Sequence, residues 1–174
     1  KNKNTETELL KNAVQEKVKK MVKINPSRID FFDKLQKLID DYNNNSINVE
    51  ELFKLLTEFV NDLNEEDRRH FAEQLTEEEL TVFDILTKPR IEMSDKEIKK
   101  VKKIAKTLLA KLKNEKITLD WRKHQASRAS VKVAIKDELE QLPECYKEIY
   151  DHKCKLVYQH VYENYFNPDQ STYV

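Results

Sequence analysis

Hydrophobic residues recur every three or four positions through most of this chain, and that spacing places them on one face of an α-helix. The alternation of apolar and polar residues that marks a half-buried strand never persists beyond a few positions. We therefore predict an all-α fold, an irregular helical bundle of about seven or eight helices. The expected helices span residues 6–22, 28–43, 49–62, 65–74, 77–87, 95–114, 120–141 and 145–165.

Local motifs indicate where these helices begin and end. In a capping box, the first residue and the residue three positions later each accept a hydrogen bond from the other's backbone N–H. Pro26, Pro89 and Pro143 interrupt the helical pattern, because proline has a fixed φ and no N–H. Asn45 follows an expected helix end, where asparagine can adopt the left-handed conformation usually taken by glycine. The pairs with capping-box spacing are Thr76 with Glu79, Ser94 with Glu97 and, as weaker versions, Asn48 with Glu51 and Asn64 with Asp67.

The expected helix 95–114 separates its residues by type. Its apolar residues form one stripe that should face the core. Five lysines project from the other side and are candidates for contact with a partner or with a DNA backbone. A solvated helix face, contact with nucleic-acid phosphates and docking on an acidic protein surface all fit this pattern. The apolar stripe consists of Ile98, Val101, Ile104, Ala105, Leu108, Leu109 and Leu112, and the lysines are Lys96, Lys99, Lys100, Lys103 and Lys106.

The next segment adds three candidates for partner or DNA contact, Arg122, Lys123 and Arg128. Arg128 lies on an otherwise apolar stripe, so its guanidinium must reach an anion or extend to water. An internal ion pair and a partner interface both satisfy that requirement. Trp121 is a candidate interface anchor, although a lone tryptophan at a helix start also serves as a core residue.

Charge is unevenly distributed along a chain whose net charge is zero. Residues 96–136 contain 14 Lys and Arg against three acidic residues, a balance of +11, so the rest of the chain carries −11. Such asymmetry marks a basic or acidic partner-facing surface, or an internal electrostatic fit between the two parts. We expect one domain over residues 1–174, and the charge reversal near residues 88–90 allows two subdomains, 1–88 and 89–174.

Composition excludes several classes of protein. The chain contains no glycine, so it lacks the glycine-rich loops that bind nucleotide phosphates. No apolar run reaches the roughly 18 residues needed to cross a bilayer, and we expect no membrane association. Cys145 and Cys154 do not form a CxxC pair, which suits a reducing cytoplasm. The first residue is not methionine, so we expect a fragment of a longer protein.

No combination of residues predicts a catalytic or metal centre. The acidic clusters at residues 65–67 and 77–79 lie in expected first helical turns, where carboxylates complement the helix dipole. Cys145, His152 and His160 are separated by about two helical turns, too far for one zinc ion. We therefore expect no catalytic, cofactor-binding or metal-binding residue in this chain, and no enzymatic activity of its own.

Five short blocks occur in a fixed order that is similar to a known family. Together they resemble the C-terminal helical region of the R (restriction and translocation) subunit of type I restriction–modification enzymes. The resemblance covers residues 9–166, nearly the whole chain. The blocks are NPSRIDF at residues 25–31, IDDYN at 39–43, LTEEEL at 75–80, LDWRK at 119–123 and YQHVY at 158–162.

The resemblance implies that this chain is a non-catalytic assembly domain of a larger bacterial or archaeal enzyme in the cytoplasm. The family's nuclease site and its motor, which use ATP and Mg²⁺, lie upstream of this region. Its implied partners are the methyltransferase core, made of modification and specificity subunits, and the upstream domains of its own subunit. Two alternatives remain: sequence-independent contact with the duplex DNA backbone, or a helical brace that packs only within its own subunit.

Overall fold

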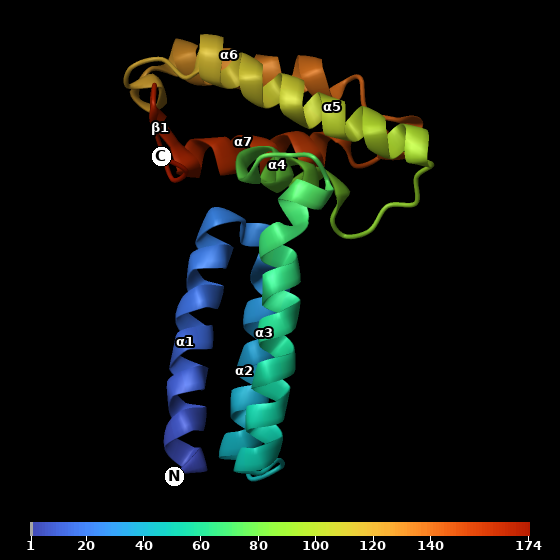
Figure 1. Ribbon diagram of the computed structural model, residues 1–174. Coiled ribbons are helices and arrows are strands. Elements are labelled where there is room, and N and C mark those ends of the chain that lie inside the picture. Colours follow the sequence, from blue (N-terminus) through green and yellow to red (C-terminus); the bar gives the residue numbers. More distant parts are fainter. Residues whose placement is uncertain (1) are drawn as a thin grey trace. The chain divides into compact units, whose positions relative to one another are not determined.

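The computed structural model describes residues 2–174, and these form two compact units that divide between Gln74 and Leu75. Figure 1 shows the order of the elements along the chain. Seven α-helices account for most of the described residues, which confirms the predicted all-α class. None of the described helices is long and apolar enough to cross a membrane.

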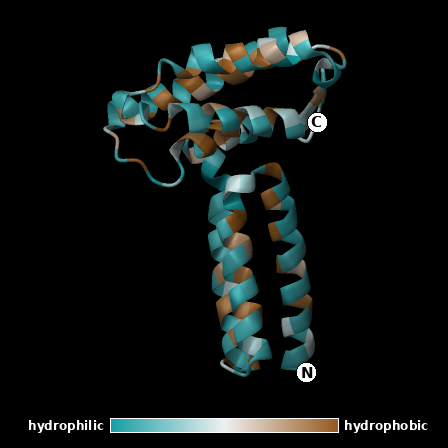
Figure 2. Ribbon diagram, turned by 180° about the vertical axis from the view of Figure 1, so that it is seen from behind, coloured by the Kyte–Doolittle hydropathy of each residue, from teal (hydrophilic) through white to brown (hydrophobic). Residues whose placement is uncertain are grey.

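The first unit is a three-helix bundle in which each helix packs against the other two. It consists of α1 (Lys3–Ile24), a 3₁₀ turn (Pro26–Arg28), α2 (Ile29–Asn43) and α3 (Val49–Ala72). Figure 2 shows its hydrophobic positions in bands along the helices rather than all round them. From α3, Leu52, Leu56, Phe59 and Leu63 are at most 1% exposed, and their spacing of three and four residues makes one buried stripe.

One expected helix boundary in this unit is wrong. The sequence predicts separate helices over 49–62 and 65–74, but α3 continues through that point to Ala72. The side chain of Asn64 does not cap a new helix; its Oδ1 instead accepts a hydrogen bond from Nζ of Lys17 at 2.9 Å. The buried stripe also continues through Leu63 without a break, so the core favours one long helix over two short ones.

The second unit is a ring of four helices around its own core. Its elements are α4 (Glu77–Thr87), α5 (Asp95–Lys111), α6 (Gln125–Leu139) and α7 (Tyr150–Asn164), and each helix packs against its neighbour in the order α4, α5, α6, α7 and back to α4. The strands β1 (Tyr165–Asn167) and β2 (Gln170–Ser171) follow as an antiparallel pair, with Tyr165 opposite Ser171 and Asn167 opposite Gln170. This ribbon was not expected, because strands of three and two residues are too short to show alternation.

Three expected helices of the second unit are shorter than the sequence predicts. Helix α5 ends at Lys111 and gives way to a π-helical turn, Leu112–Lys116. The expected helix 120–141 becomes a 3₁₀ turn, Trp121–Lys123, followed by α6, because extended backbone at His124 separates them. The expected helix 145–165 likewise becomes a 3₁₀ turn, Glu144–Tyr146, and then α7.

The predicted capping boxes at Asn48, Thr76 and Ser94 are confirmed. In each, the cap side chain accepts from the backbone N–H three residues later, and the glutamate there accepts from the N–H of the cap residue. For the Thr76 box the two distances are 3.2 and 2.9 Å. Asn45 adopts the expected left-handed conformation, with φ of 57°.

Packing and charge divide the chain at different positions. The compact units divide before α4, whereas the charge reversal near residues 88–90 falls in the connection between α4 and α5. Helix α4 belongs with the second unit because Leu80, Val82, Phe83 and Leu86 are buried in the same core as α5 and α7. The acidic helix α4 therefore packs inside the unit that also carries most of the basic residues.

Candidate docking surfaces

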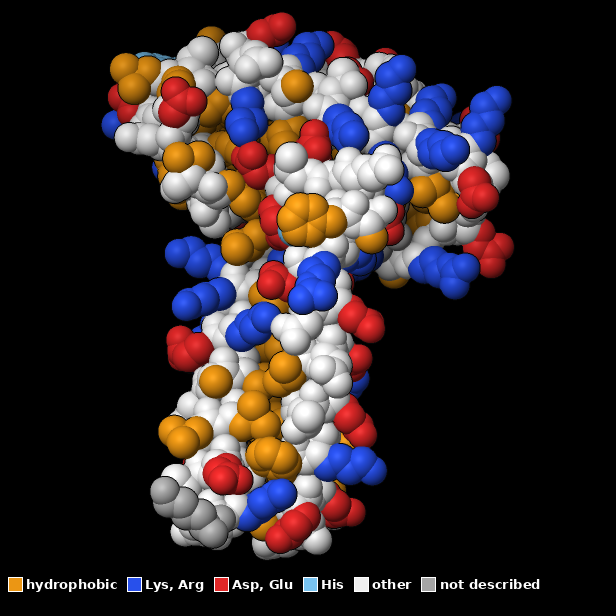
Figure 3. Space-filling model, in the orientation of Figure 1, with side chains coloured by type: hydrophobic (Ala, Val, Ile, Leu, Met, Phe, Trp, Pro, Cys, Tyr) orange, Lys and Arg blue, Asp and Glu red, His pale blue; other side chains and the backbone are white. Residues whose placement is uncertain are grey.

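The five lysines predicted to share a face of α5 all lie on its exposed side. The opposite side of the helix packs against the core, since Val101, Ala105 and Leu108 are fully buried. Figure 3 shows Lys and Arg side chains gathered over α5. None of the five forms an ion pair within the described part of the chain. The exposed lysines, here called the α5 lysine face, are Lys96, Lys99, Lys100, Lys103 and Lys106.

Trp121 is completely buried in the second unit. Its indole N–H donates a hydrogen bond to the carbonyl of Tyr165 at 2.8 Å. Its ring meets Tyr158 and Tyr162 edge-on, with centroid distances of 6.4 and 5.9 Å. The indole is therefore a core residue that supports the two tyrosine rings and is not exposed at the surface.

Arg122, Lys123 and Arg128 have different surroundings. The Arg122 guanidinium lies over the rings of Tyr162 and Phe166, 5.4 and 4.9 Å from their centroids, and donates to the Tyr162 carbonyl. Arg128 donates to the carbonyl of Arg122 at 2.6 Å, so a backbone oxygen rather than an anion satisfies its guanidinium. Lys123 forms an exposed ion pair with Asp120 at 3.2 Å.

A groove runs between α6 and α7, next to these arginines. Its cavity has a volume of about 440 Å³. One of its lysines, Lys132, places Nζ 4.8 Å from the centroid of the Tyr158 ring. Sequence reasoning did not select the residues of this groove, because it forms only where α6 and α7 lie side by side. The residues that line the α6–α7 groove are Lys132 and Lys136 from α6 and Asp151, Cys154, Lys155 and Tyr158 from α7.

The α6–α7 groove combines cationic side chains with a cysteine and a tyrosine that burial keeps protonated. Burial raises the pKa of the Cys154 thiol, which keeps it neutral and weakly nucleophilic. Burial also raises the pKa of the Tyr158 hydroxyl, with the charge of Arg128 acting in the opposite direction. The remaining polar groups are three lysines and one aspartate. The groove therefore offers cations at its rim and a partly apolar floor.

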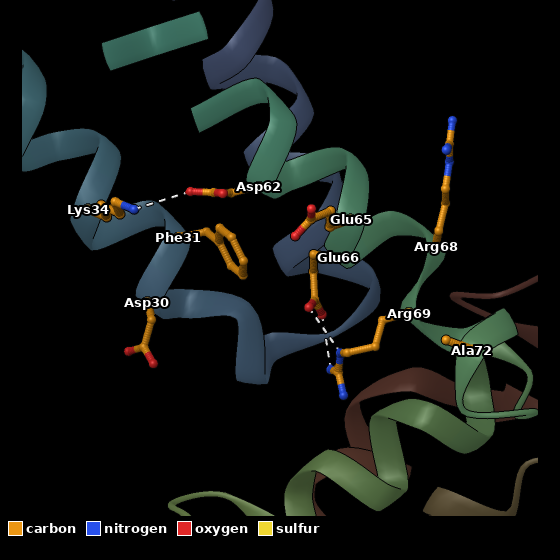
Figure 4. A pocket seen from close by; sticks show the side chains of 9 residues that line it. All are labelled: Asp30, Phe31, Lys34, Asp62, Glu65, Glu66, Arg68, Arg69 and Ala72. Carbon is orange, nitrogen blue, oxygen red and sulfur yellow. Dashed lines mark hydrogen bonds and ion pairs between the residues drawn. The ribbon is translucent and has the colours of Figure 1, made fainter. Parts of the chain in front are cut away.

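A second groove lies in the first unit, between α2 and α3, with a volume of about 750 Å³. Figure 4 shows Glu66 and Arg69 joined at one end of it, Lys34 and Asp62 joined at the other, and Arg68 pointing away. The residues that line this α2–α3 groove are Asp30, Phe31, Lys34, Asp62, Glu65, Glu66, Arg68, Arg69 and Ala72.

Glu66 connects the α2–α3 groove to the interior of the first unit. Its carboxylate accepts from Nε and Nη2 of Arg69, both at 3.0 Å, and from Nε of Arg28 at 3.0 Å. Arg28 is 1% exposed and comes from the 3₁₀ turn that links α1 to α2. The network ties this turn to α3. Because the Glu66 carboxylate is hydrogen-bonded to both guanidinium groups, the buried charge of Arg28 has an anionic partner, and the network stabilises the unit. The sequence alone had given Arg28 no role.

The described residues contain no group of three or more His, Cys, Asp or Glu arranged to hold a metal ion. His160 is buried on α7, whereas His152 on the same helix and Cys145 in the preceding 3₁₀ turn are exposed, so the three do not converge. Lys153 is also buried, and its Nζ donates to the carbonyls of Ile85 and Lys88 at 2.7 and 2.8 Å. That ammonium group caps the end of α4, and burial lowers its pKa.

These features define a class of protein: an all-helical module with two closed cores, exposed cationic side chains and two surface grooves. The whole chain except its last eight residues, 1–166, matches the family model described as type I restriction enzyme HindI endonuclease subunit-like, C-terminal. The chain belongs to this family, and the resemblance found in the five sequence blocks is confirmed. No curated protein and no solved structure matches the chain. Family membership implies assembly with other restriction–modification subunits.

Proposed function

We propose that this chain is a non-catalytic docking domain that helps attach the endonuclease subunit to a methyltransferase core of modification and specificity subunits. The observation that carries the proposal is the excess of exposed basic side chains on the second unit, held by helices around a closed core. Such a surface suits a preformed acidic partner, because complementary charge speeds encounter and fixes orientation. Catalysis, with its ATP and Mg²⁺, would belong to upstream domains of the same subunit.

Size-exclusion chromatography tests this proposal. The chain is mixed with its cognate methyltransferase core at moderate salt, with and without duplex DNA. We expect co-elution without DNA. Co-elution only when DNA is present would contradict docking, and the absence of any complex would favour a brace that packs within its own subunit.

A second candidate function is sequence-independent contact with the DNA backbone through the α5 lysine face. Its specific support is the spacing of five unpaired lysines over residues 96–106, a helical rise of about 15 Å. At 3.4 Å per phosphate along one strand, that length spans roughly four phosphates. Base reading is not part of this candidate, because lysines alone provide no bidentate contact to a base edge.

Fluorescence anisotropy with a labelled duplex tests the DNA candidate. Changing Lys99, Lys100 and Lys103 to glutamate should abolish binding, and wild-type affinity should fall steeply as salt is raised. The matched control reverses three exposed lysines of the first unit, Lys20, Lys23 and Lys54. Equal losses in both variants, or an affinity that salt does not change, would argue against a specific role for the α5 lysine face.

A further inference from the structure

We propose that the α6–α7 groove is the site at which an acidic, amphipathic helix of a partner protein docks. This inference rests on the proposed docking function and gives it a location and a partner chemistry. It assigns protein docking to a different surface from the α5 lysine face. Three observations carry it: the arrangement of charge, the partly apolar floor and the fixed positions of two arginines beside the groove.

Positive charge predominates along the groove. The spacing of Arg128, Lys132 and Lys136 places them on one stripe of α6. Lys155 faces this stripe from α7, and Arg122 extends it beyond the start of α6. Asp151 is the one carboxylate among the residues that line the groove. From Arg128 to Lys136 the helical rise is about 12 Å, or roughly two turns, which matches a short docked helix.

The floor of the groove distinguishes a protein partner from a nucleic acid. Cys154 is 5% exposed, and the rings of Tyr158 and Tyr162 lie 6.1 Å apart along α7. An acidic amphipathic helix can place apolar side chains on such a floor and carboxylates against its cationic rim. A sugar–phosphate backbone would use the rim alone. Base stacking is also disfavoured, because Lys132 lies over Tyr158 and Arg122 lies over Tyr162.

Two arginines beside the groove are held in place before any partner arrives. Arg122 is fixed by two aromatic rings and by the Tyr162 carbonyl, and Arg128 is fixed by the Arg122 carbonyl. Trp121 supports the same tyrosines from the core. Groups that are already ordered lose less conformational entropy on binding, which favours affinity. The buried tryptophan thus contributes to docking by positioning the surface rather than by entering the interface.

Zero-length cross-linking tests this site directly. The full endonuclease subunit is assembled with its methyltransferase core and treated with a carbodiimide, which joins a lysine amine to a carboxylate as an amide with loss of water. Mass spectrometry should find Lys132, Lys136 or Lys155 joined to Glu or Asp residues of a helix in the modification or specificity subunit. The comparison lysines are Lys99 and Lys100 on α5. Cross-links to the core from these two alone would overturn the inference.

Charge reversal provides the second test in the same assembly. We expect K132E/K155E to weaken affinity for the core about tenfold or more, and K99E/K100E to change it less than about twofold. Trp121 fluorescence and circular dichroism verify that each variant is folded. If the wild-type subunit binds the core and K132E/K155E binds it equally well, the α6–α7 groove is not the docking site, although the docking function itself is retained. Failure of the wild-type subunit to bind the core would refute docking itself. If K132E/K155E lowered affinity only for duplex DNA, the groove would be a DNA-binding site and the inference would be refuted.

Discussion

At the scale of single residues, buried charges in this protein depend on specific partners. Glu66 binds two arginines in the first unit, and in the second unit Lys153 is paired with backbone carbonyls. Placing a charge in the interior is unfavourable unless it is paired and hydrogen-bonded, so removal of one partner should lower the free energy of unfolding substantially. These residues are recognisable in the sequence only as polar positions, because their partners lie far along the chain.

The Glu66 network predicts unequal effects for two substitutions. Glu66→Gln removes the charge that neutralises buried Arg28, and we expect it to lower the free energy of unfolding by about 3 kcal/mol. Arg28→Met should cost less, because Glu66 keeps its two bonds to Arg69. Urea unfolding followed by circular dichroism measures both. Equal losses for the two variants would contradict this order.

His160 predicts a pH dependence of stability. Burial lowers its pKa to about 4, and the charges of Glu163 and Glu78 act weakly in the opposite direction. Between pH 6.5 and 4 the unfolded chain binds a proton on this residue that the folded chain does not bind, so stability falls as the pH drops. From pH 7 to 5 we expect a contribution of about 2 kcal/mol from this histidine.

The pH effect is measured by urea unfolding at pH 7 and pH 5, with the fluorescence of Trp121 reporting on the second unit. His160→Gln should remove most of the difference between the two pH values. His152→Gln is the control, because His152 is exposed on the same helix. If the His160 variant keeps the full wild-type difference, another group must be responsible.

At the scale of elements, the features that the sequence predicts best are those determined by interactions between residues close together in the chain. Helix positions follow from the period of apolar residues, and the starts at Thr76 and Ser94 follow from capping spacing, because both signals lie within a few residues. The break expected at Asn64 fails because Lys17 engages that side chain from another helix.

The interruption at the start of the expected helix 120–141 and the α6–α7 groove could not be predicted from the sequence, because both depend on contacts between distant residues. Asn167 accepts from the Asp120 N–H, and Tyr165 accepts from Trp121, each more than 40 residues away. The α5 lysine face needs only one helix and could be predicted, whereas the α6–α7 groove needs two helices placed side by side. Contacts of that range cannot be read from periodicity.

The capping box at Thr76 predicts a modest and local effect. Thr76→Ala removes the acceptor for the Glu79 N–H, and we expect a loss of about 1 kcal/mol in unfolding free energy. Thr107→Ala is the matched control, because Thr107 lies at an exposed position inside α5 where alanine favours the helix. Unfolding followed by Trp121 fluorescence compares the two. A larger loss at Thr107 than at Thr76 would contradict the capping account.

At the scale of the whole molecule, the chain contains two cores that close independently, with the basic candidate surfaces on the second unit. A docking domain needs a rigid support for its contact groups, and the helical ring of the second unit provides one. The first unit has its own groove, where Lys34 is paired with Asp62, and Glu66 with Arg28 and Arg69. On this account the second unit contacts the partner, and the family's catalytic work belongs elsewhere in the assembly.

Competition tests the docking claim most directly. Labelled full-length endonuclease subunit is bound to its methyltransferase core without DNA, and an excess of this chain, verified as folded by circular dichroism, is added. We expect the chain to displace the labelled subunit, and K132E/K155E to displace it far less. Full retention of the labelled subunit in the presence of excess folded wild-type chain would contradict the account.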